Sequence, residues 1–269
     1  MRTVAKALAA MGGVSGTSAL IRAGVSRRKL EGAVLEGSVL RVARGVYTLP
    51  DADPVLVHAA RHHAVPGCVT AAVSAGLWVV KVPHLPHLSA SHGRPIPGCL
   101  VHRSNGPLTH LDIVCQSLRC LPPIEALTIA ESAVKKGLVQ LPALRERFPA
   151  MREKAILGLV AKIRPQSGSI IETMARHLLE EAGLTVELQV NIPGMGHLDL
   201  LVDGLLGIET DGYAHHSSRD AYREDRRRWN VGVVRGVPVL RVTFEMVLNE
   251  PQEFVRMVQR ALATYRAAQ

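Results

Sequence analysis

Three acidic residues in the last third of the chain have the spacing of a divalent metal site. Asp199 lies in one predicted strand, and Glu209 and Asp211 lie in the next. Carboxylates crowded on one side of a sheet repel each other unless a cation neutralises them, and an all-oxygen ligand set suits Mg²⁺ or Mn²⁺. We therefore take Asp199, Glu209 and Asp211 as candidate ligands for one of these ions.

The register of the predicted hairpin decides whether these acids meet. Asp203-Gly204 is a turn sequence between the two strands. A two-residue loop there would put Asp199 and Glu209 on opposite faces of the sheet. We expect instead a three-residue loop, residues 202–204, with Gly204 in the left-handed region. Because this loop pairs residue 199 with residue 207, it places the three acids on one face.

Glu172 and two histidines are candidates for the chemistry around the acids. Ser169-Ile-Ile-Glu172 is a capping box, so Glu172 has two compatible interpretations, as a helix cap and as a further acid of the site. His215 and His216 follow the acids directly, and imidazole titrates near neutral pH, so either could move protons as a general base or acid. The alternatives are a partly exposed loop for the histidines and a plain turn for Asp211-Gly212.

Five arginines between residues 219 and 228 form a basic stripe on a predicted helix. Arg226 and Arg228 are the candidates for contacts with phosphate groups. Three acidic residues are interleaved with them, so a solvated face held by salt bridges is the alternative.

An α/β unit with a central sheet must position these groups. Its predicted elements, in chain order, are helix 170–181, strands 185–190, 197–202 and 205–211, helix 218–231, strand 237–243 and helix 251–266.

The first fifth of the chain is a basic module. Residues 1–50 hold eight of the Lys and Arg residues and two of the Glu residues. Helices are predicted over 4–11, 17–23 and 26–36, and strands over 39–43 and 46–49. Gly24 supplies the bend of a helix-turn-helix and Ser26 caps the next helix, whose first turn enters the major groove in that motif. The candidate DNA-binding residues are Arg22, Arg27, Arg28, Lys29, Arg41 and Arg44; a solvated charged face is the alternative.

The middle region separates these two modules. A break at residues 51–54 and a joint at residues 164–168 predict domains over 1–50, 54–165 and 168–269. We expect a helix over 70–76, a loop rich in Pro and His over 83–97, and a helix over 123–136. His58 and His62 are one helical turn apart, but no zincin motif or cysteine pair accompanies them, so we interpret the histidines as surface or packing residues.

Two resemblances extend this interpretation. Residues 24–30 and 44–47 resemble the winged-helix domain of AbiEi-type antitoxins and regulators, which implies binding of double-stranded DNA. The middle region weakly resembles the middle segments of the same proteins.

The segments 199–216, 225–228 and 239–243 resemble the very-short-patch-repair-like (Vsr-like) endonucleases of the PD-(D/E)XK superfamily, a likeness that spans residues 168–248. It implies that Glu172, Asp199 and Glu209 bind metal and activate water for attack on a phosphodiester. The lysine usual two residues after the glutamate is Asp211 here, as in the short-patch-repair-like branch, where a nearby histidine serves.

The resulting prediction is an α/β multidomain protein with a winged helix-turn-helix, a middle α/β region and a restriction-endonuclease-like αβββαβ domain. Its function would be Mg²⁺- or Mn²⁺-dependent DNA cleavage in phage defence or repair. The alternative is a non-catalytic transcriptional regulator or antitoxin with an inactive nuclease fold. A cognate protein partner or a homodimer is also expected.

Composition bounds these expectations. The net charge of +9 favours a polyanionic partner, and 3% aromatic residues argue against a base-stacking single-strand binder. The apolar runs are too short for a signal peptide or a membrane span, and the four cysteines lack a disulfide or Cys-x-x-Cys pattern. We therefore expect a cytoplasmic protein with reduced thiols and no membrane partner.

Overall fold

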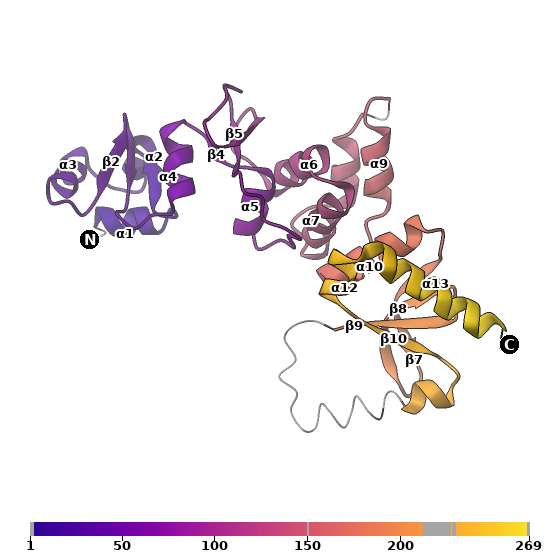
Figure 1. Cartoon of the computed structure of the whole chain (residues 1–269). Coiled ribbons are helices and arrows are strands. Elements are labelled where there is room, and N and C mark those ends of the chain that lie inside the picture. Colours follow the sequence, from indigo (N-terminus) through magenta and orange to yellow (C-terminus); the bar gives the residue numbers. More distant parts are fainter. Residues whose placement is uncertain (1–2, 150, 212–226, 228–229, 268–269) are drawn as a thin grey trace. The chain divides into compact units, whose positions relative to one another are not determined.

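The chain folds as a mixed α/β multidomain protein. Its computed structural model (Figure 1) describes residues 3–149, 151–211, 227 and 230–267, without the side chain of Asp211. The chain divides into two compact units, residues 1–76 with 82–116 and residues 77–81 with 117–269. This division falls inside the predicted 54–165 region. No helix of the described ranges is both long and apolar enough to cross a bilayer.

The first half of the first unit contains the three helices and two strands that were predicted, and one further strand over residues 14–16 that was not. They are α1 (Val4–Ala9), β1 (Val14–Gly16), α2 (Thr17–Arg22), α3 (Arg27–Leu35), β2 (Leu40–Ala43) and β3 (Val46–Thr48), with β3 central in a three-stranded sheet. Buried Leu8, Leu20 and Leu30 hold the three helices together. Gly24 has a φ of +86°, and the Ser26 hydroxyl accepts the Lys29 N–H at 3.3 Å, so the predicted turn and cap are confirmed.

A second small sheet follows in the same unit. Its elements are α4 (Pro54–Arg61), β4 (Val65–Pro66), α5 (Cys68–Ser74), β5 (His87–Ala90), β6 (Leu100–Arg103) and the first part of α6 (His110–Cys120). Strand β5 pairs antiparallel with β4 and parallel with β6. The expected loop over 83–97 is wrong, because it contains β5. All four residues of β5 are buried, and this packing outweighs the local Pro and His content.

The helices of the second unit contain a buried ion pair. The helices are α7 (Pro123–Lys135), α8 (Leu141–Glu146), α9 (Lys154–Ala161) and α10 (Ile170–Glu181). The guanidinium of Arg176 on α10 donates to Glu131 on α7 at 2.6 Å, and both side chains are 0% exposed. Glu131 also accepts the Thr173 hydroxyl at 2.6 Å and the Arg164 N–H at 2.7 Å. This network fixes α10, and hence Glu172, against α7.

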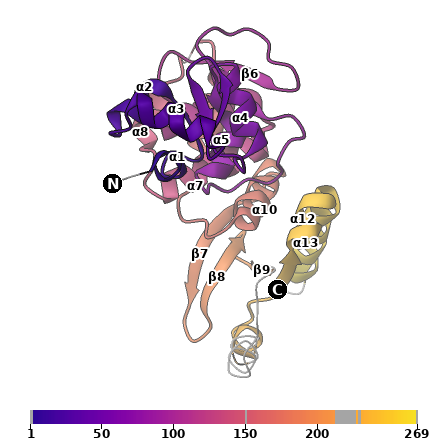
Figure 2. The ribbon, with the colours of Figure 1, turned by 90° about the vertical axis from the view of Figure 1, so that its left-hand side faces the viewer.

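A four-stranded sheet completes the second unit. Its elements are β7 (Val186–Ile192), β8 (Gly196–Val202), β9 (Leu206–Asp211), β10 (Val239–Thr243), α12 (Phe244–Asn249) and α13 (Pro251–Ala267), in the strand order β10-β9-β8-β7. Strands β7 and β8 form the long hairpin seen in Figure 2, and β10 pairs parallel with β9. Met174 and Leu179 of α10 pack against Leu200 and Ile208 of the sheet, with Phe254 of α13 in the same core.

The hairpin between β8 and β9 differs from the predicted one by one residue. Leu200 pairs with Ile208 and Val202 with Leu206, so the loop is residues 203–205 and residue 207 faces residue 201, not 199. Val202 stays in the ladder because its side chain is buried in the core. Asp203 belongs to the turn instead: its φ is +50°, that of Gly204 is +67°, and its carboxylate accepts the Thr185 N–H at 2.8 Å.

Candidate functional site

Glu172 is a buried acid at the start of α10. The hydroxyl of Ser169 accepts the Glu172 N–H at 3.2 Å and donates to its Oε1 at 3.0 Å, which confirms the predicted cap. The Gly168 N–H donates to Oε2 at 2.7 Å. A Cβ atom at Gly168 would lie 2.7 Å from Oε1, so glycine permits this approach. These contacts fix the side chain of Glu172. It therefore caps the helix and also faces the sheet.

Gln189 joins Glu172 to Asp199. Its Nε2 donates to Glu172 Oε2 at 2.9 Å and to Asp199 Oδ1 at 3.3 Å. Gln189 has a φ of +51°, an unusual conformation for a non-glycine residue within a strand. Asp199 Oδ2 accepts both the N–H and the hydroxyl of Thr210, at 2.9 and 2.8 Å. The structure therefore brings Glu172, Gln189, Asp199 and Thr210 into one polar group.

Glu209 belongs to a different pair. Its Oε2 accepts a hydrogen bond from Arg241 at 3.2 Å, and the two residues lie opposite each other on β9 and β10. Because side chains alternate along a strand, Glu209 lies on the face opposite buried Ile208, which α10 covers. Leu200 pairs with Ile208, so the same alternation places Asp199 on the face of Glu209, although the Asp199 carboxylate accepts from Thr210. Of the predicted acids, Asp199 and Glu172 are brought together. Within the described chain, Glu172, Asp199 and Glu209 alone form no group of ligand atoms close enough to share an ion.

Burial raises the pKa of Glu172. The negative charge of Asp199 acts in the same direction, while the hydrogen bonds from Gly168, Gln189 and Ser169 lower it. A cation beside the two acids would favour their ionised forms.

The raised pKa of Glu172 predicts a pH-dependent stability. A carboxyl whose pKa is raised by folding binds its proton more tightly in the folded state, so its contribution to stability is lost as pH rises through the folded-state pKa. We expect the wild-type chain to lose more stability than Glu172→Gln between pH 4 and pH 8. Urea unfolding of both proteins across this range measures the difference. Identical pH slopes would contradict the assignment.

The remaining predicted catalytic residues are only partly placed. Asp211 ends β9 opposite Thr243, and its side chain lies outside the described part. His215, His216, Arg226 and Arg228 also lie outside the described residues. Arg227 is described, and its guanidinium donates to the Gly194 carbonyl at 3.2 Å.

The predicted DNA-binding residues of the first unit are exposed. Arg27, Arg28 and Lys29 occupy the first turn of α3, which holds no acidic residue. Exposed side chains are also found for Arg22 at the end of α2, Arg41 on β2 and Arg44 in the β2–β3 turn. These side chains give the unit a surface to which phosphate groups have access.

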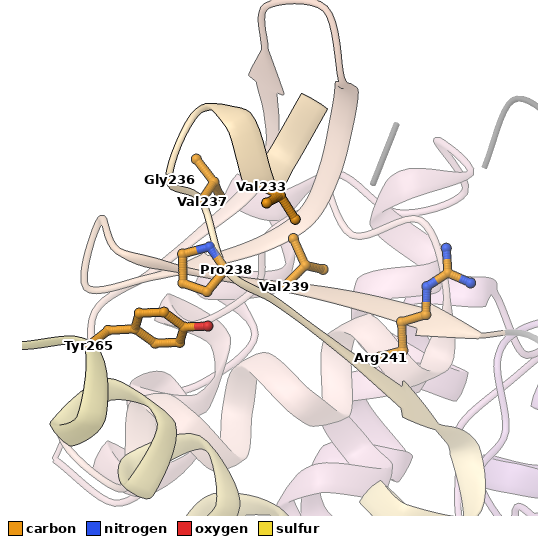
Figure 3. A pocket seen from close by; sticks show the side chains of 7 residues that line it. All are labelled: Val233, Gly236, Val237, Pro238, Val239, Arg241 and Tyr265. Atoms are coloured by element: carbon orange, nitrogen blue, oxygen red, sulfur yellow. The ribbon is translucent and has the colours of Figure 1, made fainter. Parts of the chain in front are cut away.

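A hollow beside the edge strand β10 offers little chemistry. Val233, Val237, Pro238 and Tyr265 line it, and Arg241 lies at its opposite end from Tyr265 (Figure 3). Its lining is largely apolar, and no carboxylate is among the lining residues. The hollow is therefore separate from the Glu172–Asp199 group.

Three residues of the site escaped the sequence interpretation. Thr210 and Gln189 hold Asp199, and Arg241 pairs with Glu209. The alternation Ile208-Glu209-Thr210 contained a signal, since it puts Thr210 on the core side of β9. No sequence signal pointed to Gln189, because its role depends on contacts with α10 and β8. Comparison of the chain with protein-family models and with curated protein sequences finds no match.

Proposed function

We propose that this protein is a DNA endonuclease that uses Mg²⁺ or Mn²⁺ and is positioned by a DNA-binding first module. The observation that carries the proposal is the link between buried Glu172 and Asp199 through Gln189. The order of α10, three antiparallel strands and a parallel β10 supports it, since it agrees with the αβββαβ arrangement expected of a restriction-endonuclease-like domain.

The oxygen donors of this group fit a hard divalent cation. Asp199 accepts three hydrogen bonds and Glu172 accepts three, so each carboxylate keeps acceptor capacity for an ion. Asp199, Glu209 and Asp211 are the proposed ligands, and Glu172 is linked to Asp199 through Gln189. Glu209 would exchange its hydrogen bond from Arg241 for the ion. Such an ion would supply Lewis acidity and a more acidic bound water.

The protein side chains would position the reacting groups. Thr210 holds the Asp199 carboxylate in one orientation through two hydrogen bonds. In the proposal, His215 or His216 moves the protons, and Arg226 and Arg228 contact the phosphate. Substitution of a histidine or of an arginine in these roles should therefore lower the rate of DNA cleavage.

Plasmid cleavage by the full chain tests the proposal. We expect nicked or linear DNA with Mg²⁺ or Mn²⁺, no product with EDTA, and strongly reduced product with Glu209→Ala. Glu253→Gln, at an exposed acid on α13, serves as the control that keeps activity. No cleavage under either metal, or equal cleavage by wild type and Glu209→Ala, would count against the proposed site.

The basic surface of the first module predicts salt-dependent DNA binding. We propose a winged helix-turn-helix here, with α3 in the major groove and Arg41 and Arg44 near the backbone. Arg27→Ala and Arg28→Ala should each weaken binding and lower the slope of log affinity against log salt by about 1. Fluorescence anisotropy with duplex DNA at several salt concentrations measures this. Arg61→Ala, which removes the same charge from α4, should change the slope less; an equal change would contradict the assignment to α3.

A non-catalytic regulator is the second candidate. The Glu209–Arg241 pair favours it, because that arginine neutralises an acid the nuclease would need. This alternative expects promoter binding that depends on Arg27 and Arg28 and tolerates Asp199→Ala, with no cleavage under any metal.

A further inference from the structure

Three potential metal ligands converge in the small sheet of the first unit, far in sequence from the acids of β8 and β9. Cys68 is the first residue of α5, His87 the first residue of β5, and His102 lies on β6. One ligand atom from each lies within 4.8 Å of the others. Cys68 and His87 are buried and His102 is partly buried, so the group is largely removed from water.

The strand register explains why the two histidines meet. His87 pairs with Leu100 and Ser89 with His102 in the parallel β5–β6 ladder, so both imidazoles lie on one face, two residues apart. His102 Nε2 lies 3.4 Å from His87 Nδ1, and the ring centroids are 5.5 Å apart.

Cys68 is held next to them by backbone contacts. The N–H of Gly67 donates to the His87 carbonyl at 2.9 Å, which ties the start of α5 to the start of β5. Cys68 has a φ of +46°, a left-handed conformation that costs a non-glycine residue about 1–3 kcal/mol. The surrounding contacts therefore fix the cysteine in a conformation that it does not favour by itself.

Polar side chains support the backbone that carries the ligands. Gln116 on α6 accepts the Cys68 N–H at 2.9 Å and donates to the Ser89 hydroxyl at 2.8 Å. The hydroxyl of Thr70 accepts the His87 N–H at 2.8 Å. Hydrogen-bonded partners of this kind orient the ligands at protein metal sites. One helical turn after Gln116, α6 ends at Cys120, whose sulfur is the fourth ligand atom of the same group.

We propose that Cys68, His87 and His102 bind a structural Zn²⁺ ion, with Cys120 as the fourth ligand. Sulfur and imidazole nitrogen are the ligands of structural zinc sites, whereas Mg²⁺ prefers oxygen. In a tetrahedral site the ligand atoms lie about 3.3–3.8 Å apart by the usual Zn–N and Zn–S lengths, so modest side-chain movements close this group around an ion. The ion would join α5, β5, β6 and α6, independently of the acids of the proposed nuclease site.

A metal titration of the full chain, kept reduced and stripped with a chelator, tests this proposal. We expect one Zn²⁺ or Co²⁺ per chain, the thiolate charge-transfer and visible bands of tetrahedral Co²⁺, and a higher unfolding temperature with Zn²⁺ than with Mg²⁺. Absence of bound Zn²⁺ and of these Co²⁺ bands in the wild-type chain would overturn the proposal. This measurement needs no variant, so it does not depend on how a substitution affects folding.

Substitutions assign the ligands. Cys68→Ser and His102→Ala should abolish the Co²⁺ bands and the stabilisation by Zn²⁺, and Cys120→Ser should lower Zn²⁺ affinity at least about tenfold. Cys99→Ser and His58→Ala, matched residues of the first unit outside the group, should leave both unchanged. Unchanged metal binding by Cys68→Ser or His102→Ala would overturn the proposal. Stabilisation by an oxidant without metal would assign the sulfurs to a disulfide and overturn it as well.

Discussion

Replacing Arg176 by Met should destabilise the second unit by about 3–5 kcal/mol, the typical cost of leaving a buried charge without its partner. Arg176 and Glu131 are both 0% exposed, so water cannot replace the lost hydrogen bond at 2.6 Å. Urea denaturation, followed by circular dichroism, measures the change. A loss below about 1 kcal/mol would show that the carboxylate of Glu131 finds solvent or another cation.

A double-mutant cycle separates the ion pair from the packing of the two side chains. In Glu131→Gln with Arg176→Met both charges are removed. The Gln oxygen can still accept the Arg164 N–H, and its Nε2 can donate to the Thr173 hydroxyl, which then donates to the Ser169 carbonyl. We expect the double variant to be more stable than the sum of the single losses predicts, by about 0.5–3 kcal/mol. Simple additivity would contradict a direct interaction. Arg256→Met, at an exposed arginine of α13, should change stability little.

Asp199→Asn should lower the rate of DNA cleavage by about 100-fold or more, because it removes a ligand charge and even residues behind metal ligands typically contribute 10–100-fold. The asparagine oxygen can still accept from Thr210, so the fold should be retained. Gln189→Ala, which removes the link to Glu172, should cost about 10–100-fold. Single-turnover cleavage of a supercoiled plasmid at saturating Mg²⁺ measures both.

Asp203→Asn is the matched control for Asp199→Asn. Asp203 lies in the adjacent turn with a φ of +50°, a conformation that asparagine tolerates well. We expect near wild-type cleavage from this variant. Equal losses from both substitutions would attribute the effect to the hairpin as a whole and not to the acid. Full activity in Asp199→Asn would remove Asp199 from the proposed site.

Local patterns predicted most of the second unit. Helix α10 has the predicted bounds, because the Ser169 cap and the spacing of its apolar residues fix both its start and its period. The β8–β9 hairpin was predicted as a three-residue loop, yet its position was wrong by one residue. Burial of Val202 decided this register, and burial depends on contacts with α10 that the local sequence does not contain.

Long-range contacts account for what the sequence did not reveal. Strand β5 looked like a loop because proline and histidine dominate its surroundings, yet it is buried between β4 and β6. The interpretation of the middle-region histidines as surface or packing residues followed from the absence of a short metal motif. Cys68, His87, His102 and Cys120 are each at least 15 residues apart, so only the folded chain brings their ligand atoms together. The same holds for the link between Glu172 and Asp199.

The Glu131–Arg176 bond also limits how evolution or protein engineering could divide this chain. A fragment beginning at residue 168 would separate Arg176 from Glu131, its fully buried counter-charge, so the C-terminal part should not be portable by itself. Natural recombination that exchanges DNA-recognition modules should instead preserve the segment from α7 onward as one inherited block. A gene fusion cut between α7 and α10 should fold less stably than one cut before α7, whatever chemistry its sheet retained.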